Sequence, residues 1–212
     1  MAKEHIGNRN QQRMKPAWVA LVDILRRVEE QPFHWPVGRM MFRNMAYVAT
    51  HEGLPTGLKY RKSRYGPFSS EQKSVIARLM NNGLIREERF GPMFMVKIGP
   101  TFEDAQKAYA DELESWEPIL EKIADLFMRM NTTRAEIVAT VLFASRALGK
   151  ESKAEPAEWD VVNAVQQWEH RRKPQLDQAE LALSVRNLAA LGWIKAKASA
   201  DLPLPKEPFL DA

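Results

Sequence analysis

Carboxylates are concentrated in one stretch of this 212-residue chain, where eight Asp and Glu and only two Lys lie between Glu103 and Asp125. Paired carboxylates can act as general acid and base, but that chemistry needs a buried environment that shifts a pKa. Nothing around these acids indicates burial, so a solvated helix face is the simpler interpretation. At helical spacing the same acids can offer a partner protein a row of negative charge that imitates DNA phosphates. The residues predicted to make this contact are Asp111, Glu114, Glu117 and Glu121.

Basic residues gather in the other half of the chain. Residues 1–100 hold 17 Lys and Arg against 8 Asp and Glu, whereas residues 101–212 hold 14 against 19. The net charge of +4 therefore divides into +9 and −5. This asymmetry is typical of a nucleic-acid face, of a protein partner of opposite charge or of two halves that attract each other, and an ordinary solvated surface also accounts for it. A DNA-binding interpretation would use Arg61, Lys62, Arg64, Lys73, Arg78 and Arg89.

Residue patterns typical of enzymes and metal sites are missing from the sequence. The four histidines are scattered, with no His-x-x-x-His pair, and there is no cysteine to supply a thiolate. The glycines between Gly53 and Gly57 lack the Gly-Lys-Ser/Thr ending of a phosphate-binding loop. We therefore expect a protein that is not an enzyme, with no catalytic residue, no bound metal and no cofactor.

The elements that position these charges are organised around Tyr65-Gly66-Pro67, which is a turn signal. A helix with one apolar stripe follows and ends at Asn81-Asn82-Gly83. Two strands, at Leu84–Ile85 and Met93–Ile98, then enclose a basic turn. A helix that ends at glycine before a basic hairpin predicts a winged helix-turn-helix unit.

The second half predicts further helices. A long acidic helix starts near Thr101 and is kinked or split by Pro118, and a later helix ends at Gly149. The segment 185–195 resembles 77–86, because each ends a helix with glycine and continues with two large apolar residues and a base. The predicted fold is mainly α with small β-hairpin wings, in tandem winged-helix-like units.

The predicted organisation has four parts. They are a flexible N-terminus (1–15), a basic winged-helix-like unit (16–100), an acidic helical and degenerate winged-helix-like unit (101–200) and a Pro-rich tail (201–212). The N-terminus is polar and no stretch approaches about 20 apolar residues, so we expect a cytoplasmic protein without a signal peptide or membrane contact. The sequence leaves a homodimer open.

Several short motifs resemble known families. Residues 39–87 look like the phage-associated YwgA-like family, and the later part of the chain resembles the C-terminal domain of DarG antitoxins. The motifs are Met41–Tyr47, Glu52–Gly57, Tyr65–Ser69 and Leu79–Ile85 for the first, and Glu136–Val141, Val165–Trp168, Arg171–Lys173 and Leu191–Ile194 for the second.

In DarG that domain binds the toxin DarT, a DNA ADP-ribosyltransferase, and blocks its DNA-binding cleft, while a separate macrodomain removes the modification. The resemblance implies a non-catalytic module that neutralises a DNA-modifying toxin or another defence protein. This chain has no macrodomain, so removal of ADP-ribose is not implied. The alternative hypothesis is a winged-helix DNA-binding transcriptional regulator, whose partner would be DNA.

Overall fold

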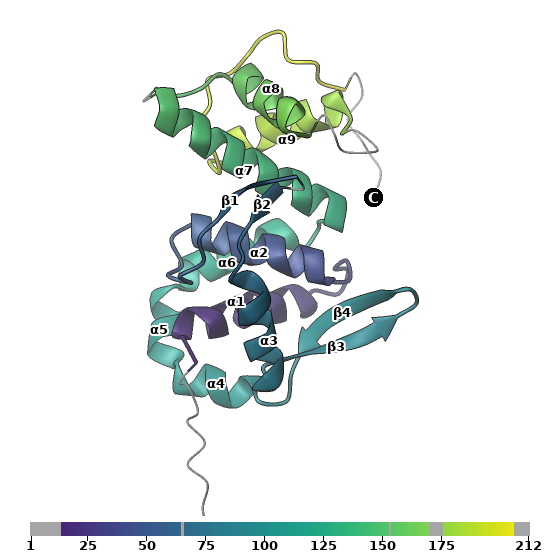
Figure 1. The fold of residues 1–212 in the computed structure, drawn as a ribbon, viewed down its shortest axis with the longest axis vertical. Coiled ribbons are helices and arrows are strands. Elements are labelled where there is room, and N and C mark those ends of the chain that lie inside the picture. The colour runs from purple at the N-terminus through teal and green to yellow at the C-terminus, as the bar shows by residue number, and fades with distance from the viewer. Residues whose placement is uncertain (1–13, 65, 153, 170–175, 206–212) are drawn as a thin grey trace, which may run out of the picture.

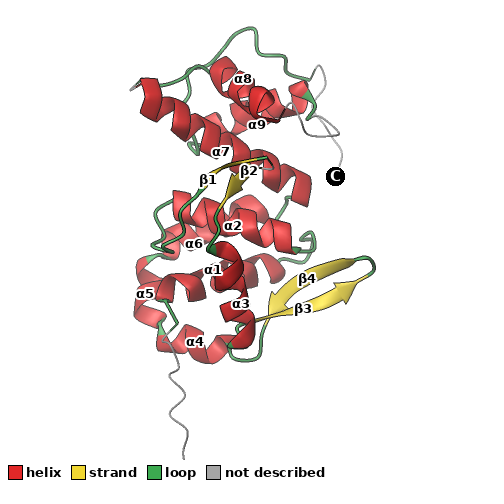
Figure 2. Ribbon diagram, viewed as in Figure 1, coloured by secondary structure: helices red, strands yellow, loops and turns green. Residues whose placement is uncertain are grey.

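The computed structural model describes residues 14–64, 66–152, 154–169 and 176–205. They form a mainly helical protein with two small antiparallel hairpins, which confirms the prediction of a mainly α fold with small β-hairpins (Figure 1, Figure 2). The helices are α1 (Pro16–Glu29), α2 (Arg39–His51), α3 (Gln72–Asn81), α4 (Phe102–Ala108), α5 (Ala110–Ser115), α6 (Glu117–Phe127), α7 (Thr132–Ser152), α8 (Glu158–Glu169) and α9 (Gln178–Ala190). The strands are β1 (Arg61–Ser63), β2 (Gly66–Phe68), β3 (Ile85–Phe90) and β4 (Met93–Ile98). Tyr65, most of the predicted flexible N-terminus and the tail from Lys206 lie outside the described residues.

Helix α1 is the centre of the core. Ten of its fourteen residues are buried, and it packs against α2, α4, α5, α6 and β4. A helix that is apolar on nearly every side has to be covered all round, which explains this many neighbours. The Trp18 indole N–H donates to the Thr56 carbonyl at 2.9 Å, so the loop after α2 is also fixed to α1.

From α1 to β4 the described residues form three helices and a terminal hairpin, as in a winged helix, with the β1–β2 hairpin inserted between α2 and α3. The short segment between α1 and α2 pairs with β4, where the Val96 N–H donates to the Val37 carbonyl at 2.8 Å. Helix α3 follows, and β3 and β4 then pair in register from Ile85↔Ile98 to Phe90↔Met93. This hairpin, the wing, projects away from the helices (Figure 2). The predicted strand Met93–Ile98 is confirmed.

A second hairpin lies where the sequence predicted a turn. Gly66 and Pro67 belong to strand β2, which pairs with β1 and packs against α7. Gly66 has a positive φ of 98°, which suits glycine, and a Cβ at this position would lie 3.2 Å from the Thr140 hydroxyl of α7. The chain therefore reverses just before Gly66, and Gly66 allows the hairpin to approach α7 closely.

The acidic stretch forms three helices: the predicted split near Pro118 lies between α5 and α6, and a second break, between α4 and α5, was not predicted. The chain breaks at Tyr109, between α4 and α5, and at Trp116, between α5 and α6. Pro118 lies in the first turn of α6, where its missing N–H costs no hydrogen bond. All three helices pack against α1, and the domain boundary near residue 100 stays a prediction.

Helices α7, α8 and α9 complete the molecule, with α7 packed against α2 (Figure 1). The predicted end of α7 at Gly149 is wrong, because the helix continues to Ser152. After α9, Lys197 forms a single parallel bridge with Ala157, and no hairpin follows α9 within the described residues. Across the part of the chain that the structure describes, no helix has the length and apolar character of a membrane span.

Candidate functional site

We call the exposed carboxylates of α4, α5 and α6 together the acidic face. They are Glu103, Asp104, Asp111, Glu114, Glu117, Glu121 and Asp125. Of the residues predicted to bind a partner, Asp111 and Glu114 lie on α5, whereas Glu117 and Glu121 lie on α6. The break at Trp116 separates the two pairs, so they do not form one continuous helical row. The acids still belong to consecutive helices that share one neighbour, α1.

Glu117 differs from the other three acids because it already has a partner. Both its oxygens accept hydrogen bonds from the Arg27 guanidinium of α1, each at 2.7 Å. This bidentate contact lowers the pKa of Glu117 despite partial burial, which acts in the opposite direction. Arg27 also donates to the buried carboxylate of Asp23 at 2.7 Å. Glu117 therefore attaches α6 to α1, and Asp111, Glu114 and Glu121 are the acids that remain for a partner.

The basic residues predicted to bind DNA divide into two groups. Arg61, Lys62 and Arg64 belong to the β1–β2 hairpin, whereas Lys73, Arg78 and Arg89 belong to α3 and the wing. Arg61 lies over the ring of Phe68 and Lys62 over the ring of Trp168. Such contacts fix the stems of exposed cations without neutralising them.

The α3 and wing group is less uniform. Arg78 is half-buried over the ring of Trp18, so it packs against α1 rather than projecting into solvent. Arg89 is exposed at the wing tip, where its Nε donates to the Gly91 carbonyl at 3.2 Å. Lys73 is exposed and lines a groove between α2 and α3.

This groove has a volume of about 270 Å³. Its α3 wall is apolar apart from Lys73, with Ile76, Ala77 and Met80 along one side. Arg39 and Arg43 of α2 line the opposite side. Arg39 forms an ion pair with Glu87 of β3 and lies over the ring of Phe94, so the groove continues onto the wing.

Large apolar side chains are exposed beside this groove. We call Met80, Phe90, Met93 and Phe94, which are 36%, 57%, 46% and 48% exposed, the wing surface. Phe90 and Met93 are direct cross-strand partners, and Phe94, being next to Met93, lies on the other face of the hairpin. Both faces of the wing therefore end in apolar side chains.

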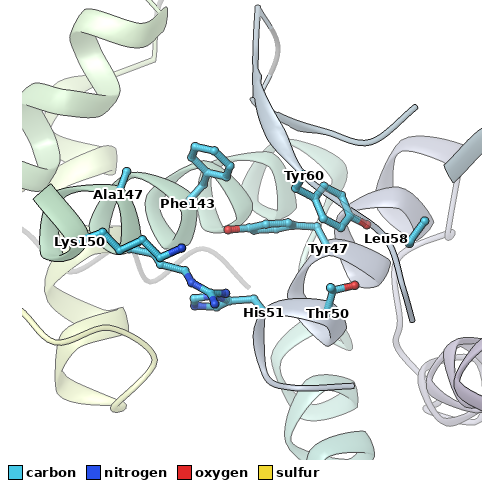
Figure 3. Close-up of a pocket in the computed structure, with 9 residues that line it drawn as sticks. Tyr47, Thr50, His51, Leu58, Tyr60, Phe143, Ala147 and Lys150 are labelled. Atoms are coloured by element: carbon cyan, nitrogen blue, oxygen red, sulfur yellow. The ribbon is translucent and has the colours of Figure 1, made fainter. Parts of the chain in front are cut away.

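An aromatic cavity lies between α2 and α7, and the sequence analysis did not predict it. It has a volume of about 390 Å³ and is lined by Tyr47, Thr50, His51, Leu58, Tyr60, Phe143, Arg146, Ala147 and Lys150 (Figure 3). The α2 and α7 residues recur three or four positions apart, which places each set on one helix face. That spacing was available in the sequence, but the packing of α2 on α7 that brings the two faces together was not.

The chain matches no protein-family model and no curated protein. The resemblance to the YwgA-like family and to the DarG domain therefore stays a prediction. Within the described ranges, no group of three His, Asp or Glu side chains is arranged to hold a metal ion.

Proposed function

We propose that this protein is a non-catalytic, cytoplasmic protein-binding module. The observation that carries the proposal is the wing surface. A winged helix that reads DNA presents polar and basic side chains from its third helix to the base edges. Here the exposed residues of α3 are mixed, with Ala77 and Met80 beside Lys73 and Ser74, and the wing ends in Phe90, Met93 and Phe94. Exposed apolar groups gathered in this way are typical of a protein interface.

The acidic face indicates the charge of the partner. Asp111, Glu114 and Glu121 are exposed on neighbouring helices, and a basic partner would gain favourable electrostatic contact with them. The resemblance to the DarG domain names one such class, a DNA-modifying toxin whose DNA-binding cleft has to be basic. In this proposal, the protein neutralises such a toxin, or another defence protein, by occupying that cleft.

Direct DNA binding is the second candidate, because Arg61, Lys62, Lys73 and Arg89 are exposed cations. These cations are distributed over two separate hairpins and α3. The neighbouring apolar side chains have no hydrogen-bond donor to offer a phosphate. This function would require an affinity for duplex DNA that falls steeply with added salt.

The test compares capture of partner proteins from the native host by the tagged wild type and by two variants. The first, D111K/E114K/E121K, reverses the three acids that pair with no other described residue. The second, F90S/M93S/F94S, makes the wing polar. Both sets of side chains are exposed, so we expect both variants to unfold at the wild-type temperature. We expect each variant to lose a basic partner that the wild type retains.

The matched control is E151K/E155K/D201K, which makes the same charge change at exposed acids outside the acidic face. It should retain the partner. Retention of the partner by the wing variant would contradict the assignment of the wing surface. Two results would favour the DNA-binding regulator instead. The purified wild type would bind duplex DNA with an affinity that falls about a thousandfold between 50 and 200 mM salt, and R61E/K62E/K73E/R89E would not bind it.

A further inference from the structure

The cavity between α2 and α7 has the dimensions of a small-molecule site. Its volume of about 390 Å³ falls in the range of ligand pockets, roughly 300–1,000 Å³. Two regions far apart in sequence form it: the end of α2 with the segment before β1, and the C-terminal half of α7. It lies away from the wing surface and involves none of the residues assigned to partner binding.

Aromatic rings form the walls of the cavity. The rings of Tyr47 and Tyr60 meet edge to face with centroids 4.9 Å apart, and the ring of Phe143 lies 6.2 Å from that of Tyr47. Phe143 is held in turn by Trp168 of α8, at 5.1 Å. Rings supported in this way by neighbouring rings offer a flat aromatic ligand surfaces for stacking.

The charges on the cavity wall indicate an anionic ligand. Arg146 and Lys150 both lie on its α7 side and are exposed, and the described residues that line the cavity include no Asp or Glu. An aromatic cage for a quaternary ammonium group would need the opposite charge. Arg146 donates to His51 Nδ1 at 3.2 Å, so the neutral His51 ring carries its proton on Nε2 and offers a further donor.

The hydroxyl of Tyr47 adds another donor inside the cavity. Figure 3 shows this hydroxyl pointing from α2 toward α7, between Phe143 and His51 and toward the Lys150 side chain. Within the described residues no hydrogen bond reaches it. Burial raises the pKa of Tyr47, so the phenol stays protonated at neutral pH and can donate to a ligand oxygen.

A second cavity adjoins the first at Arg146 and Lys150. It has a volume of about 500 Å³ and also shares His51 with the first. Its other side is lined by Leu142, Trp193 and Ile194 and by one residue of each charge, Glu155 and Lys195. An anionic group held by Arg146 and Lys150 would therefore lie between two cavities, with its aromatic ring in the first.

We propose that the cavity between α2 and α7 binds a small anionic molecule with a flat aromatic ring, of the size of a nucleoside monophosphate. The ring packs against Tyr60 and Phe143, beside the Tyr47 hydroxyl. The anionic group accepts hydrogen bonds from Arg146, Lys150 and the Tyr47 hydroxyl.

Calorimetry with the full-length protein tests this proposal. The probes are the four common nucleoside monophosphates, the matching nucleosides, inorganic phosphate and indole-3-acetate. We expect at least one aromatic anion to bind with a Kd below about 1 mM and at least about tenfold more tightly than either the nucleoside or phosphate alone. A nucleoside monophosphate that meets this criterion identifies a nucleotide site, and indole-3-acetate alone identifies a site for aromatic carboxylates.

Variants of exposed residues locate the binding. R146Q and K150Q each remove one cation. Each should lower the affinity for the probe that binds by about tenfold, because a charge-assisted hydrogen bond is lost. R134Q removes an exposed cation near the start of the same helix and should leave the affinity unchanged. Y47F removes only the hydroxyl and should weaken binding by a few fold. Binding of none of the aromatic anions, or equal affinities for the wild type, R146Q and K150Q, would overturn the proposal.

Discussion

At the scale of single residues, one buried charge holds several helices together. Asp23 is buried in α1, where its carboxylate accepts hydrogen bonds from Arg26, Arg27 and Gln106. Gln106 belongs to α4, and Arg27 continues the network to Glu117 of α6. A buried carboxylate needs such partners, because an unpaired one would be strongly destabilising. Helices α4 and α6 are therefore attached to α1 through the buried carboxylate of Asp23.

Glu158 makes a comparable contact in the second half, and its stabilising effect should depend on pH. It is 1% exposed, accepts two hydrogen bonds from Arg186 and a third from the Ser199 N–H. Burial opposes ionisation of Glu158, but these hydrogen bonds outweigh it and hold its pKa below the usual value of 4.5. A depressed folded-state pKa gives stabilisation that is present above pH 4.5 and is lost as the pH falls through the folded value.

The variant E158Q should therefore lower the free energy of unfolding at pH 7 by about 2 kcal/mol, because charge-assisted hydrogen bonds are replaced by neutral ones. The difference from the wild type should shrink as the pH is lowered from 5 to 3. Urea unfolding at several pH values measures both, with E151Q, at an exposed acid, as the control. A difference that is constant with pH would contradict the role of the Glu158 charge.

At the scale of elements, the surroundings of two glycines predict opposite effects of a glycine-to-alanine substitution on stability. Gly149 lies inside α7, and a Cβ added there would have no other atom within 4 Å, so G149A should stabilise the protein by about 0.5–1 kcal/mol. A Cβ at Gly99 would lie 2.0 Å from the Gly83 carbonyl oxygen, where β4 ends beside the end of α3. G99A should therefore destabilise by at least about 2 kcal/mol.

Thermal unfolding of the two variants measures these effects. A G149A variant less stable than the wild type would indicate that α7 ends near Gly149 in solution, as the sequence predicted. A neutral G99A would show that β4 and the end of α3 do not approach each other this closely.

The same glycines show what the sequence could predict about elements. Gly83 ends α3 as predicted, since it has a positive φ of 72° and the Leu84 N–H closes the helix on Leu79. Gly149 carried the same local signal, but packing of α7 against α2, α8 and α9 continues the helix through it. Local residue patterns thus predicted where β4, α3 and the wing lie, and tertiary packing decided the cases where a glycine is tolerated inside a helix.

The candidate sites were predictable to different degrees. The acids and bases were found because charge can be read directly from composition. That Glu117 would be paired with Arg27 depends on two residues 90 positions apart, and no local pattern indicates such a contact. The aromatic cavity is missed for the same reason, since Tyr47 and Phe143 meet only because α2 packs on α7.

At the scale of the whole molecule, the opposite charges of the two halves meet inside one fold. Arg27 of the basic half forms an ion pair with Glu117 of the acidic half. Lys122 of α6, in the acidic half, forms one with Glu52, just after α2 in the basic half, at 2.6 Å. The Arg27–Glu117 pair is thus an attraction between a base of the basic half and an acid of the acidic half, and the Lys122–Glu52 pair has the reverse polarity. Asp111, Glu114 and Glu121 make no such pair among the described contacts, so their carboxylates remain available to a partner protein.

The predicted boundary near residue 100 can be tested by cutting the chain there. Leu120, Ile123 and Phe127 of α6 are fully buried, and α6 packs against both α1 and α2. A fragment of residues 1–100 would expose the side of α1 that these residues cover, at a cost of roughly 1.5–3 kcal/mol for each large side chain left uncovered. Because a domain is stable by only about 5–15 kcal/mol, we expect this fragment not to unfold cooperatively in urea.

A fragment of residues 1–130 retains α6 and should show more helix by circular dichroism and a steeper urea transition. A cooperative transition in the 1–100 fragment would instead establish the basic winged-helix-like unit as an independent domain.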